Sequence, residues 1–485
     1  MPEAATNRKQ PTGADLIFRP PTARDKRLFS SQMLVALAAT VVAIGRSSSN
    51  GDSTAFFLGA IVCILSMLPL IIWARTMEYN YPVFELFMAT NLTSYGIPLM
   101  SEKNAADFFD DNIRSQAAIA VILFQIITMV VFYSVRSQPK RTEYWLKPVF
   151  QDLSQRWMIN GLVISSVYIV VVQFYYFPDA SIAGILRAVF FGISTSCVFI
   201  VGMAWGLGQL KQNEKTTIII CILIQFLVTS ISLVLRTGVS IILLGLVGYF
   251  FGARRLPLFT VALTLAVCAI LNIGKYDLRG QYWFGDSKKT PDLEDIPSFY
   301  LEWFSAGLAP QAKAEGEAGT MLLERNSLLQ MQCLVMSWTP ERKPFLNGLT
   351  YEDIPGQFVP RILWPDKPKA HVSTTTLSIY YGLQDEEASG STTIAFGMLP
   401  EGYANFGMMG MVLLALVFGI TFKLILVWSK DSPIFSYPGL MLILLTAWSF
   451  QTELTMAIWI TSMFQGAVSV IAFVYLFRRL QEIMT

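Results

Sequence analysis

The chain has 485 residues, of which 53% are hydrophobic and only 14% are charged. A typical soluble domain has about 25% charged residues, so this composition excludes an ordinary soluble globule. The net charge of +2 says nothing about partners, because in a membrane protein the distribution of charge matters more than its sum. Apolar stretches of about 20 residues recur, and each is long enough to cross a hydrocarbon core of about 30 Å. The sequence therefore predicts an all-α polytopic membrane protein.

The predicted elements begin after a polar and basic N-terminal tail, residues 1–28, which does not have the form of a cleavable signal peptide. Nine predicted spans follow within residues 29–273, and three more lie within residues 407–485. The third contains Pro82, Glu85, Gly96 and Pro98, so a broken or re-entrant segment is an alternative there. The twelve ranges are 29–45, 55–74, 81–100, 115–135, 157–177, 183–207, 216–235, 238–252, 257–273, 407–428, 437–452 and 455–477.

The basic residues that flank the spans decide their number. With about twelve spans and a cytoplasmic N-terminus, the Lys and Arg clusters at 136–147 and 254–255 fall on the same side as the basic N-terminal tail. Without the third span, both clusters would lie on the other side. Twelve crossings also make the C-terminus cytoplasmic and place residues 274–406 outside, as one large periplasmic loop in a bacterium. Because that compartment has no ATP or nucleotide sugar, a reaction there needs a substrate that is already activated.

A loop this long is expected to fold or to have its own task. Ser298–Leu308 is predicted to be a short amphipathic helix whose aromatic residues are of the kind that lie at a bilayer surface. Met321–Trp338 has apolar residues at near-helical spacing, and Pro340 and Pro344 end that helix. The prolines around Trp364 favour an extended or turn segment.

Several kinds of chemistry are excluded by the residues present. The chain has one histidine, His371, and five cysteines with neither metal nor disulfide spacing. It has no Walker A or GxGxxG loop, and no acidic cluster with the spacing that would hold a metal against a nucleotide diphosphate. We therefore expect a site without a metal or cofactor, and no nucleic-acid partner.

Cationic residues lie in unusual places on the predicted external side. Arg236 stands where one span ends and the next begins, while Arg325, Arg361 and Lys367 come from the loop. A charge beside the membrane is costly and usually faces a polar cavity or a partner. Arginine binds phosphate oxygens through two N–H groups and lysine binds them as a point charge, so these residues would suit a lipid-linked pyrophosphate.

These cations also have structural alternatives. Arg236 could extend to lipid headgroups, Arg325 could pair with Glu324 or Glu341, and Arg361 and Lys367 could fix the loop through Asp366. The sequence alone leaves both readings open for each of them.

Two carboxylates beside predicted spans, Glu401 and Glu453, are candidates for acid–base chemistry. Partial burial at the external face would raise the pKa of a carboxyl group toward the working pH. Structural hydrogen bonding is the alternative role for both. His371 fits a solvated loop residue better than a catalytic base.

Several short motifs follow one another in a particular order. They are Arg236 at a span junction, Glu324-Arg-Asn326, Phe345-Leu-Asn-Gly348, Pro360-Arg-Ile-Leu-Trp-Pro-Asp-Lys-Pro368 and Glu401-Gly-Tyr-Ala-Asn-Phe-Gly407. This order resembles the Wzy-type oligosaccharide repeat-unit polymerases of bacterial surface polysaccharides. The resemblance covers the whole chain in topology but only Arg325–Gly407 in readable motif, and the segment Tyr81–Pro98 is also similar to the family's N-terminal pattern.

The resemblance implies a GT-C-like, metal-independent glycosyltransferase in the bacterial inner membrane, acting at its periplasmic face. The growing chain would move from its polyprenyl diphosphate to the non-reducing end of a new lipid-linked repeat unit. Membrane lipids would surround the enzyme, and a flippase and a chain-length regulator are candidate partners. The implied catalytic residues are Glu401, Glu453 and Arg361. The implied substrate-binding residues are Arg236, Arg325, Lys367, Trp364, Tyr403, Asn405, Trp338 and His371.

Three other functions stay open. A ligase similar to the O-antigen ligases would share the lipid-linked donor, and His371 could serve it. A transporter of polysaccharide or lipid should show inverted repeats and paired broken helices, neither of which is convincing here. A membrane scaffold would not require Arg and Lys beside the spans on the external face.

Overall fold

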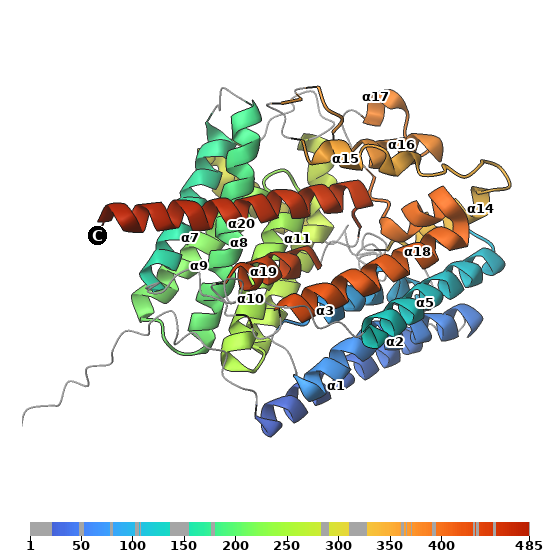
Figure 1. Cartoon of the computed structure of the whole chain (residues 1–485), viewed down its shortest axis with the longest axis horizontal. Coiled ribbons are helices and arrows are strands. Elements are labelled where there is room, and N and C mark those ends of the chain that lie inside the picture. The colour runs from blue at the N-terminus through green and yellow to red at the C-terminus, as the bar shows by residue number, and fades with distance from the viewer. Residues whose placement is uncertain are drawn as a thin grey trace, which may run out of the picture.

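The computed structural model describes residues 22–47, 53–77, 81–101, 106, 108–135, 155–175, 180–282, 291–309, 327–359, 363–364, 366–369, 371–389, 394–429, 432, 436–449 and 453–484. Within these ranges the chain forms helices joined by turns and loops, and no β-strand is present (Figure 1). The predicted all-α class is therefore confirmed for the described residues.

Long helices occupy most of the predicted spans. They are α1 (Ala23–Ser47), α2 (Ser53–Thr76), α5 (Asp111–Ser134), α7 (Gln155–Phe174), α8 (Ala180–Gly206), α9 (Gln212–Ser230), α10 (Arg236–Ala253), α11 (Leu258–Tyr282), α18 (Met398–Ser429), α19 (Tyr437–Ser449) and α20 (Met456–Met484). Among the described residues, eight helices are long and apolar enough to cross a membrane: α2, α5, α7 to α11 and α18. The protein is thus a helical membrane protein, and the twelve crossings remain a prediction.

The third predicted span is broken into pieces. It consists of α3 (Val83–Asn91), a π-helical turn η2 (Leu92–Gly96) and α4 (Ile97–Met100). The turn packs closely against α2, since a Cβ atom on Gly96 would lie only 2.6 Å from Cys63 Sγ. The break matches the alternative that Gly96 and Pro98 suggested.

Helices α8 and α10 cross at very short range because glycines line their contact. A Cβ atom on Gly202 would lie 2.4 Å from the carbonyl oxygen of Gly245, and one on Gly248 would lie 2.2 Å from that of Phe199. Small residues let helix backbones approach closely in a membrane, where no hydrophobic effect drives them together. The contact pairs rise together along both helices, so α8 and α10 run parallel, as the predicted topology requires.

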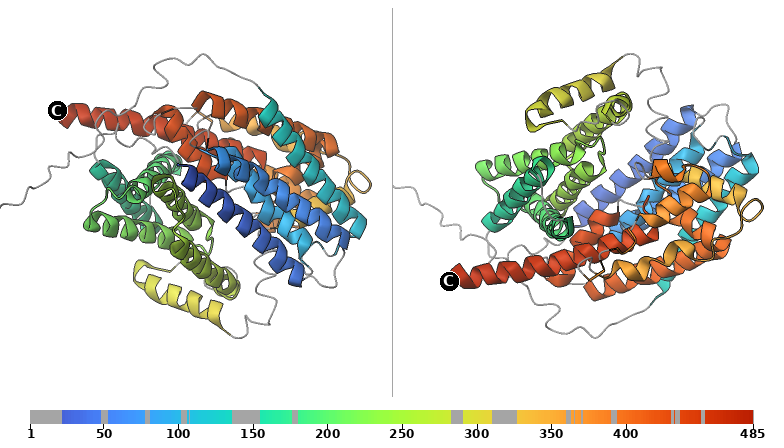
Figure 2. Two further views of the ribbon diagram at one scale, coloured as in Figure 1. Left: turned by 90° about the horizontal axis from the view of Figure 1, so that it is seen from below. Right: turned by 90° about the horizontal axis from the view of Figure 1, so that it is seen from above.

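Buried amides add hydrogen bonds between the helices. Gln225 of α9 accepts a hydrogen bond from Ser194 of α8 at 2.5 Å and donates one to Ser166 of α7 at 2.9 Å. Gln125 of α5 donates to Ser66 of α2 at 2.8 Å. Two helix groups result, α7–α11 and α2–α5 with α18, and α20 runs beside both (Figure 2).

The helix α18 begins nine residues before the predicted span and bends sharply. Phe406 and Gly407 have non-helical backbone angles, with φ at +61° for Gly407. The two parts then pack so closely that a Cβ atom on Gly410 would lie 2.0 Å from the carbonyl oxygen of Gly402. Residues 398–405 therefore form a separate short helix that turns back against the span.

The insertion between α11 and α18 contains several short helices. They are α12 (Ile296–Leu308), α14 (Leu329–Trp338), α15 (Ile354–Gln357), α16 (Val372–Tyr380) and α17 (Glu386–Ser389), together with the 3-10 turns η3 (Leu293–Asp295) and η5 (Leu349–Tyr351). The predicted helix Ser298–Leu308 is confirmed as α12. Of Met321–Trp338, only Leu329–Trp338 is helical among the described residues, because Ser327 and Leu328 are not.

Two of these helices pack against the spans rather than standing apart. On α12, Phe299 and Trp303 are buried, and the Trp303 indole donates a 2.6 Å hydrogen bond to the carbonyl oxygen of Leu271 in α11. On α14, Leu329 and Cys333 are fully buried, and the preceding Leu328 N–H donates a 2.9 Å hydrogen bond to the carbonyl of Ser94 in η2. The insertion is thus integrated into one end of the bundle.

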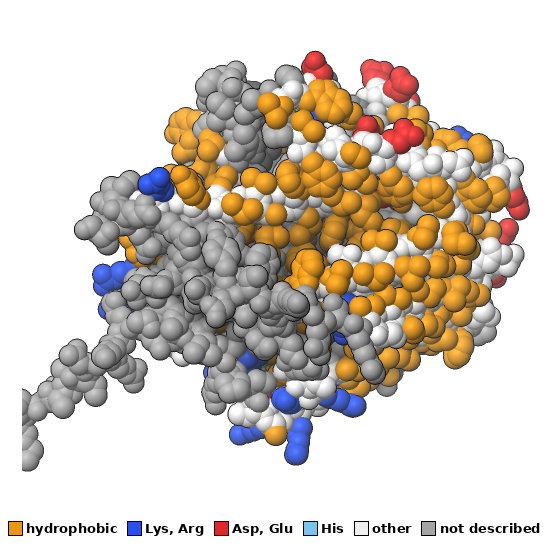
Figure 3. Space-filling view, in the orientation of Figure 1, with side chains coloured by type: hydrophobic (Ala, Val, Ile, Leu, Met, Phe, Trp, Pro, Cys, Tyr) orange, Lys and Arg blue, Asp and Glu red, His pale blue; other side chains and the backbone are white. Residues whose placement is uncertain are grey.

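Charged side chains separate along the molecule. In Figure 3, Lys and Arg gather at the lower left, while Asp and Glu gather at the upper right, near the elements of the insertion in Figure 1. Apolar side chains cover the surface between them. This distribution is the one expected for a bundle with one basic and one acidic membrane face.

Candidate functional site

The turn between α19 and α20 is the meeting point of the predicted site residues. The Glu453 carbonyl oxygen accepts a 3.0 Å hydrogen bond from the N–H of Gly397, before α18. The Thr455 hydroxyl lies 3.0 Å from that of Ser373 and 3.2 Å from that of Thr374, both in α16. Residues 453–456 therefore join α16 to the start of α18. We call them the 453–456 turn.

Arg236 joins this turn from α10. Its Nη1 lies 2.8 Å from Oε1 of Glu453, and the two side chains are 36% and 33% exposed. Arg236 is the first residue of α10, where the positive end of the helix dipole disfavours a cation. The nearby carboxylate offsets that unfavourable position, and the partial exposure leaves both groups accessible to a ligand.

His371 and Lys369 lie beside the same pair. The pKa of His371 is lowered from its ordinary value, first by desolvation and then by the positive charges of Arg236 and Lys369. The imidazole reaches the surface at the residue that precedes α16. The structure thus brings together Arg236, Glu453 and His371, which the sequence separates widely, and adds Lys369, which the sequence analysis did not select.

Glu401 lies deeper, with no exposed surface. Its Oε2 accepts a 2.6 Å hydrogen bond from the N–H of Met456, the first residue of α20. A carboxylate at that place stabilises the start of a helix, both by capping an N–H group and through the helix dipole. Its burial favours a role in positioning the 453–456 turn, and the catalytic role remains a prediction.

Asn405 links two of the motifs noticed in the sequence. Its Oδ1 accepts a 2.9 Å hydrogen bond from the N–H of Gly348, and its Nδ2 donates 2.8 Å hydrogen bonds to the Thr350 hydroxyl and to the carbonyl of Glu401. Asn347 and Gly348 have φ values of +50° and +96°, as in the tight turns that Asn-Gly favours. Asn405 is fully buried, so this geometry supports a structural role more than sugar binding.

Lys367 closes a loop of the insertion. Its ammonium donates hydrogen bonds to the carbonyl oxygens of Gln357 at 3.1 Å and Val359 at 2.7 Å, and Gln357 Nε2 donates to the carbonyl of Pro368 at 3.1 Å. These contacts match the loop-fixing alternative, although they use backbone carbonyls instead of Asp366. Trp364 is 45% exposed and its ring packs on Gly356. Neither residue contacts Arg236 through a hydrogen bond described for it.

The remaining predicted residues lie elsewhere or outside the described ranges. Trp338 and Tyr403 are half-buried on the far side of α16, where Tyr403 packs against Phe345 with ring centroids 6.4 Å apart. Arg325 and Arg361 lie outside the described residues, so the predicted group of four cations is neither assembled nor dispersed by the structure. Within the described residues, no group of three His, Cys, Asp or Glu side chains could hold a metal ion.

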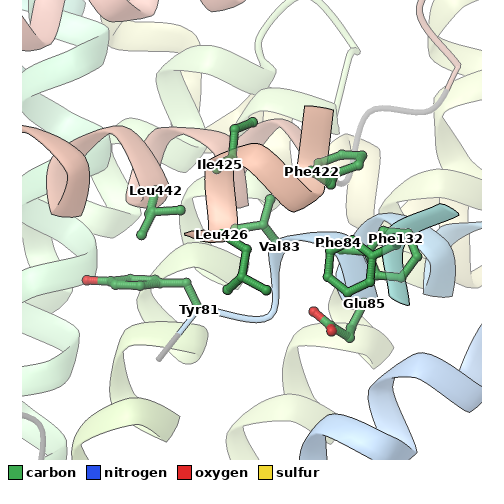
Figure 4. A pocket seen from close by; sticks show the side chains of 9 residues that line it. All are labelled: Tyr81, Val83, Phe84, Glu85, Phe132, Phe422, Ile425, Leu426 and Leu442. Atoms are coloured by element: carbon green, nitrogen blue, oxygen red, sulfur yellow. The ribbon is translucent and has the colours of Figure 1, made fainter. Parts of the chain in front are cut away.

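A small cavity lies away from this turn. It is lined mainly by aliphatic and aromatic side chains of α3, α5, α18 and α19, with the carboxyl group of Glu85 and the hydroxyl of Tyr81 at its edge (Figure 4). It is bounded by the far ends of α5 and α18 from the insertion, since Phe132 and Phe422 line it. It has few polar groups to orient a substrate.

Sequence reasoning missed the hydroxyl groups of Ser373, Thr374 and Thr455. No spacing marked them, because they meet only when α16 packs against the 453–456 turn. A run of three residues, Ser373-Val-like in neither period nor charge, gives no signal beyond the polar character of Ser-Thr-Thr-Thr at 373–376.

The fold and the charged turn define a helical membrane protein with a candidate site at one end of its bundle. The family model described as "Domain of unknown function (DUF8712)" matches residues 119–479, which include α10, the insertion and α18–α20. The chain belongs to this family. No curated protein and no solved structure matches it.

Proposed function

We propose that this protein is a glycosyltransferase that polymerises polyprenyl-diphosphate-linked oligosaccharides at the periplasmic face of a bacterial inner membrane, with both termini cytoplasmic. The observation that carries the proposal is the half-exposed ion pair between Arg236 and Glu453, with Lys369 and His371 beside it. Three positively charged or protonatable groups and one carboxylate fit a reaction in which a diphosphate leaves and a hydroxyl group loses a proton.

In the proposed step, the bond between the donor sugar's anomeric carbon and the diphosphate oxygen breaks. The carrier diphosphate leaves with the electron pair, and Arg236 and Lys369 stabilise its charge. The acceptor hydroxyl oxygen forms the new bond to the anomeric carbon, and its proton passes to Glu453. Binding of the diphosphate to Arg236 would release Glu453 from its ion pair and make it available as the base.

The other predicted residues keep supporting roles in this proposal. Glu401 and Asn405 hold the 453–456 turn and the Gly348 turn in place, and Lys367 holds the loop that contains Arg361. Arg325 and Arg361 remain proposed ligands of the diphosphate, and Trp364, Tyr403 and Trp338 remain proposed sugar contacts.

The test is polymerisation by purified protein in lipid vesicles, with a polyprenyl-diphosphate-linked repeat unit as the only substrate and no added nucleotide. The expected product is a ladder of lipid-linked polymers in the wild type. Arg236→Gln should lower the rate by about 10²-fold or more, as expected for loss of a group that stabilises developing charge. Arg255→Gln, an exposed cation elsewhere in the chain, serves as the matched control. Equal ladders from all three proteins would refute the assignment.

A ligase-like transfer is the second candidate, and the position of His371 beside Arg236 favours keeping it. Such an enzyme would use the same donor but attach the glycan to a different acceptor. Analysis of the product distinguishes the two, since a ligase would give single attachment to an added lipid acceptor and no ladder on the polyprenyl carrier.

A further inference from the structure

A second group of cations lies at the other end of α16 from His371. It consists of Trp338, Arg342, Lys343 and Tyr380, and we call it the basic aromatic patch. The Arg342 guanidinium carbon lies 5.9 Å from the centre of the Trp338 ring, and the Lys343 ammonium lies 5.8 Å from it. The same ammonium lies 4.7 Å from the centre of the Tyr380 ring. These distances are within the range of cation–π attraction.

Hydrogen bonds fix the patch to the rest of the insertion. The Lys343 ammonium donates to the carbonyl oxygen of Tyr380, and the Tyr380 hydroxyl donates a 2.7 Å hydrogen bond to the carbonyl oxygen of Pro344. Beneath them, the hydroxyl groups of Thr339 and Tyr381 lie 2.6 Å apart and are buried. The two cations therefore stand on a rigid base and need little ordering when a ligand binds.

Neither cation is neutralised by a carboxylate. Among the described residues, the ion pairs are those of Arg114 with Asp111 and of Arg236 with Glu453, and neither involves the patch. Arg342 is exposed and Lys343 is half-buried. Two adjacent cations, held over aromatic faces and without a partner carboxylate in the described part of the chain, form a place for an anion.

The patch and the Arg236 site share one helix. His371 directly precedes α16, and Tyr380 is its last residue, so the nine residues of α16 separate the two places by about 13 Å. A ligand that reaches both must be extended and must carry an anionic group away from the diphosphate. An oligosaccharide with acidic sugars has this form.

We infer that the basic aromatic patch binds a carboxylate-bearing sugar of the glycan while the Arg236 site holds its diphosphate. The inference rests on the proposed function, because it assigns the second end of the same substrate. Arg342 makes the exposed charge–charge contact with the sugar carboxylate. Lys343 adds a second, partly desolvated contact.

The experiment measures binding of an oligogalacturonate, which has one carboxylate on each sugar, to the full-length protein in neutral-lipid nanodiscs. Its methyl ester is the uncharged control. We expect the ester to bind at least about 10-fold more weakly, and Arg342→Gln to weaken binding of the acid by a similar factor, since charge-assisted hydrogen bonds are the strong ones. Arg342→Lys should retain most of the binding, and Arg255→Gln should not change it.

Equal binding of the acid and the ester, or equal binding by wild type and Arg342→Gln, would overturn the inference. Arg342 is exposed, so loss of folding does not explain a loss of binding, and an unchanged melting temperature checks this. Nanodiscs of anionic lipid form a further arm, in which strong loss of oligogalacturonate binding would assign the patch to lipid headgroups instead. Binding without polymerisation would refute the proposed function and leave the patch intact, whereas polymerisation of a neutral repeat at full rate by Arg342→Gln without acid binding would refute the patch alone.

Discussion

Arg236 and Glu453 are 217 positions apart in the chain, yet their Nη1 and Oε1 atoms lie 2.8 Å apart at the end of the bundle that contains the insertion. The pair joins the start of α10 to the turn before α20. Both side chains keep about a third of their surface exposed. A pair this exposed contributes little to folding, typically below about 1 kcal/mol, so stability alone does not account for a cation at a helix N-terminus.

Removing the charge of Glu453 should therefore affect activity far more than stability. We expect Glu453→Gln to change the free energy of unfolding by less than about 1 kcal/mol. The rate of polymer formation should fall by about 10²-fold or more, because glutamine cannot accept the proton of the acceptor hydroxyl. The measurements are the polymerisation rate and unfolding in detergent, with Glu352→Gln, a half-buried loop carboxylate, as the control. A variant that loses stability and activity in proportion would point to a structural ion pair.

The single histidine allows the electrostatics of the site to be measured directly. Burial, Arg236 and Lys369 all lower the pKa of His371, so we expect a titration midpoint below its ordinary value of about 6.5. Arg236→Gln should raise this midpoint. Because the chain has one histidine, the imidazole signal of protein labelled at histidine reports His371 alone. A midpoint at or above the ordinary value, or one that Arg236→Gln leaves unchanged, would contradict the described arrangement.

The same shift predicts how stability depends on pH. A histidine whose pKa is lower in the folded state takes up a proton more readily when unfolded, so its contribution disfavours the folded state as pH falls below about 6.5. Wild-type protein should therefore lose more stability between about pH 7 and pH 5 than His371→Gln does. A thermal unfolding series across that range checks the sign.

The sequence predicts the spans well because helix formation in a membrane depends on local composition. A helix lies on each of the long apolar ranges, and the prolines and glycine of the third range correspond to its division into α3, η2 and α4. The bend at Phe406 and Gly407 was not predicted. The apolar run and the preceding motif are continuous in helical character, and only the close contact between Gly402 and Gly410 shows that the chain turns back.

The site is less predictable because its members meet only through packing. Residue type selected Arg236, Glu453 and His371, and the structure places them side by side. Residue type could not separate Lys367, whose ammonium is engaged by backbone carbonyls, from Lys369, which lies near His371. Those two lysines differ in where the loop places them, and no local pattern records that difference.

Glu401 should act through the helix that it caps. In Glu401→Gln, an amide oxygen can still accept the hydrogen bond of the Met456 N–H, whereas Glu401→Ala leaves that N–H unsatisfied. We expect the alanine variant to lose about 1–2 kcal/mol of stability, and the glutamine variant to lose less. Polymerisation should be largely retained in Glu401→Gln if the residue only positions the 453–456 turn. An inactive but stable Glu401→Gln would restore the predicted catalytic role.

Asn405 should be more important for stability than a surface sugar contact would be. Its side chain makes three hydrogen bonds in a fully buried place, to Gly348, Thr350 and Glu401. Asn405→Ala leaves buried partners unsatisfied, so we expect a loss of about 2–3 kcal/mol. The same substitution at the exposed Asn347 should have a smaller effect and serves as the control. A stable Asn405→Ala with weakened glycan binding would favour the sugar contact that the sequence suggested.

The parallel contact of α8 with α10 gives the last prediction, which concerns the scaffold that carries Arg236. A Cβ atom on Gly248 would lie 2.2 Å from the carbonyl oxygen of Phe199, so Gly248→Ala forces the two backbones apart. We expect this to cost about 1–3 kcal/mol, the usual range for overpacking. Gly245→Ala is the matched control in the same helix, because its nearest neighbour is the flexible side chain of Val198 at 3.3 Å. Unfolding of both variants in detergent tests the pair. If the two substitutions had equal effects, the crossing of α8 and α10 would not be as close as the structure shows, and Arg236 would lose the rigid support on which its position depends.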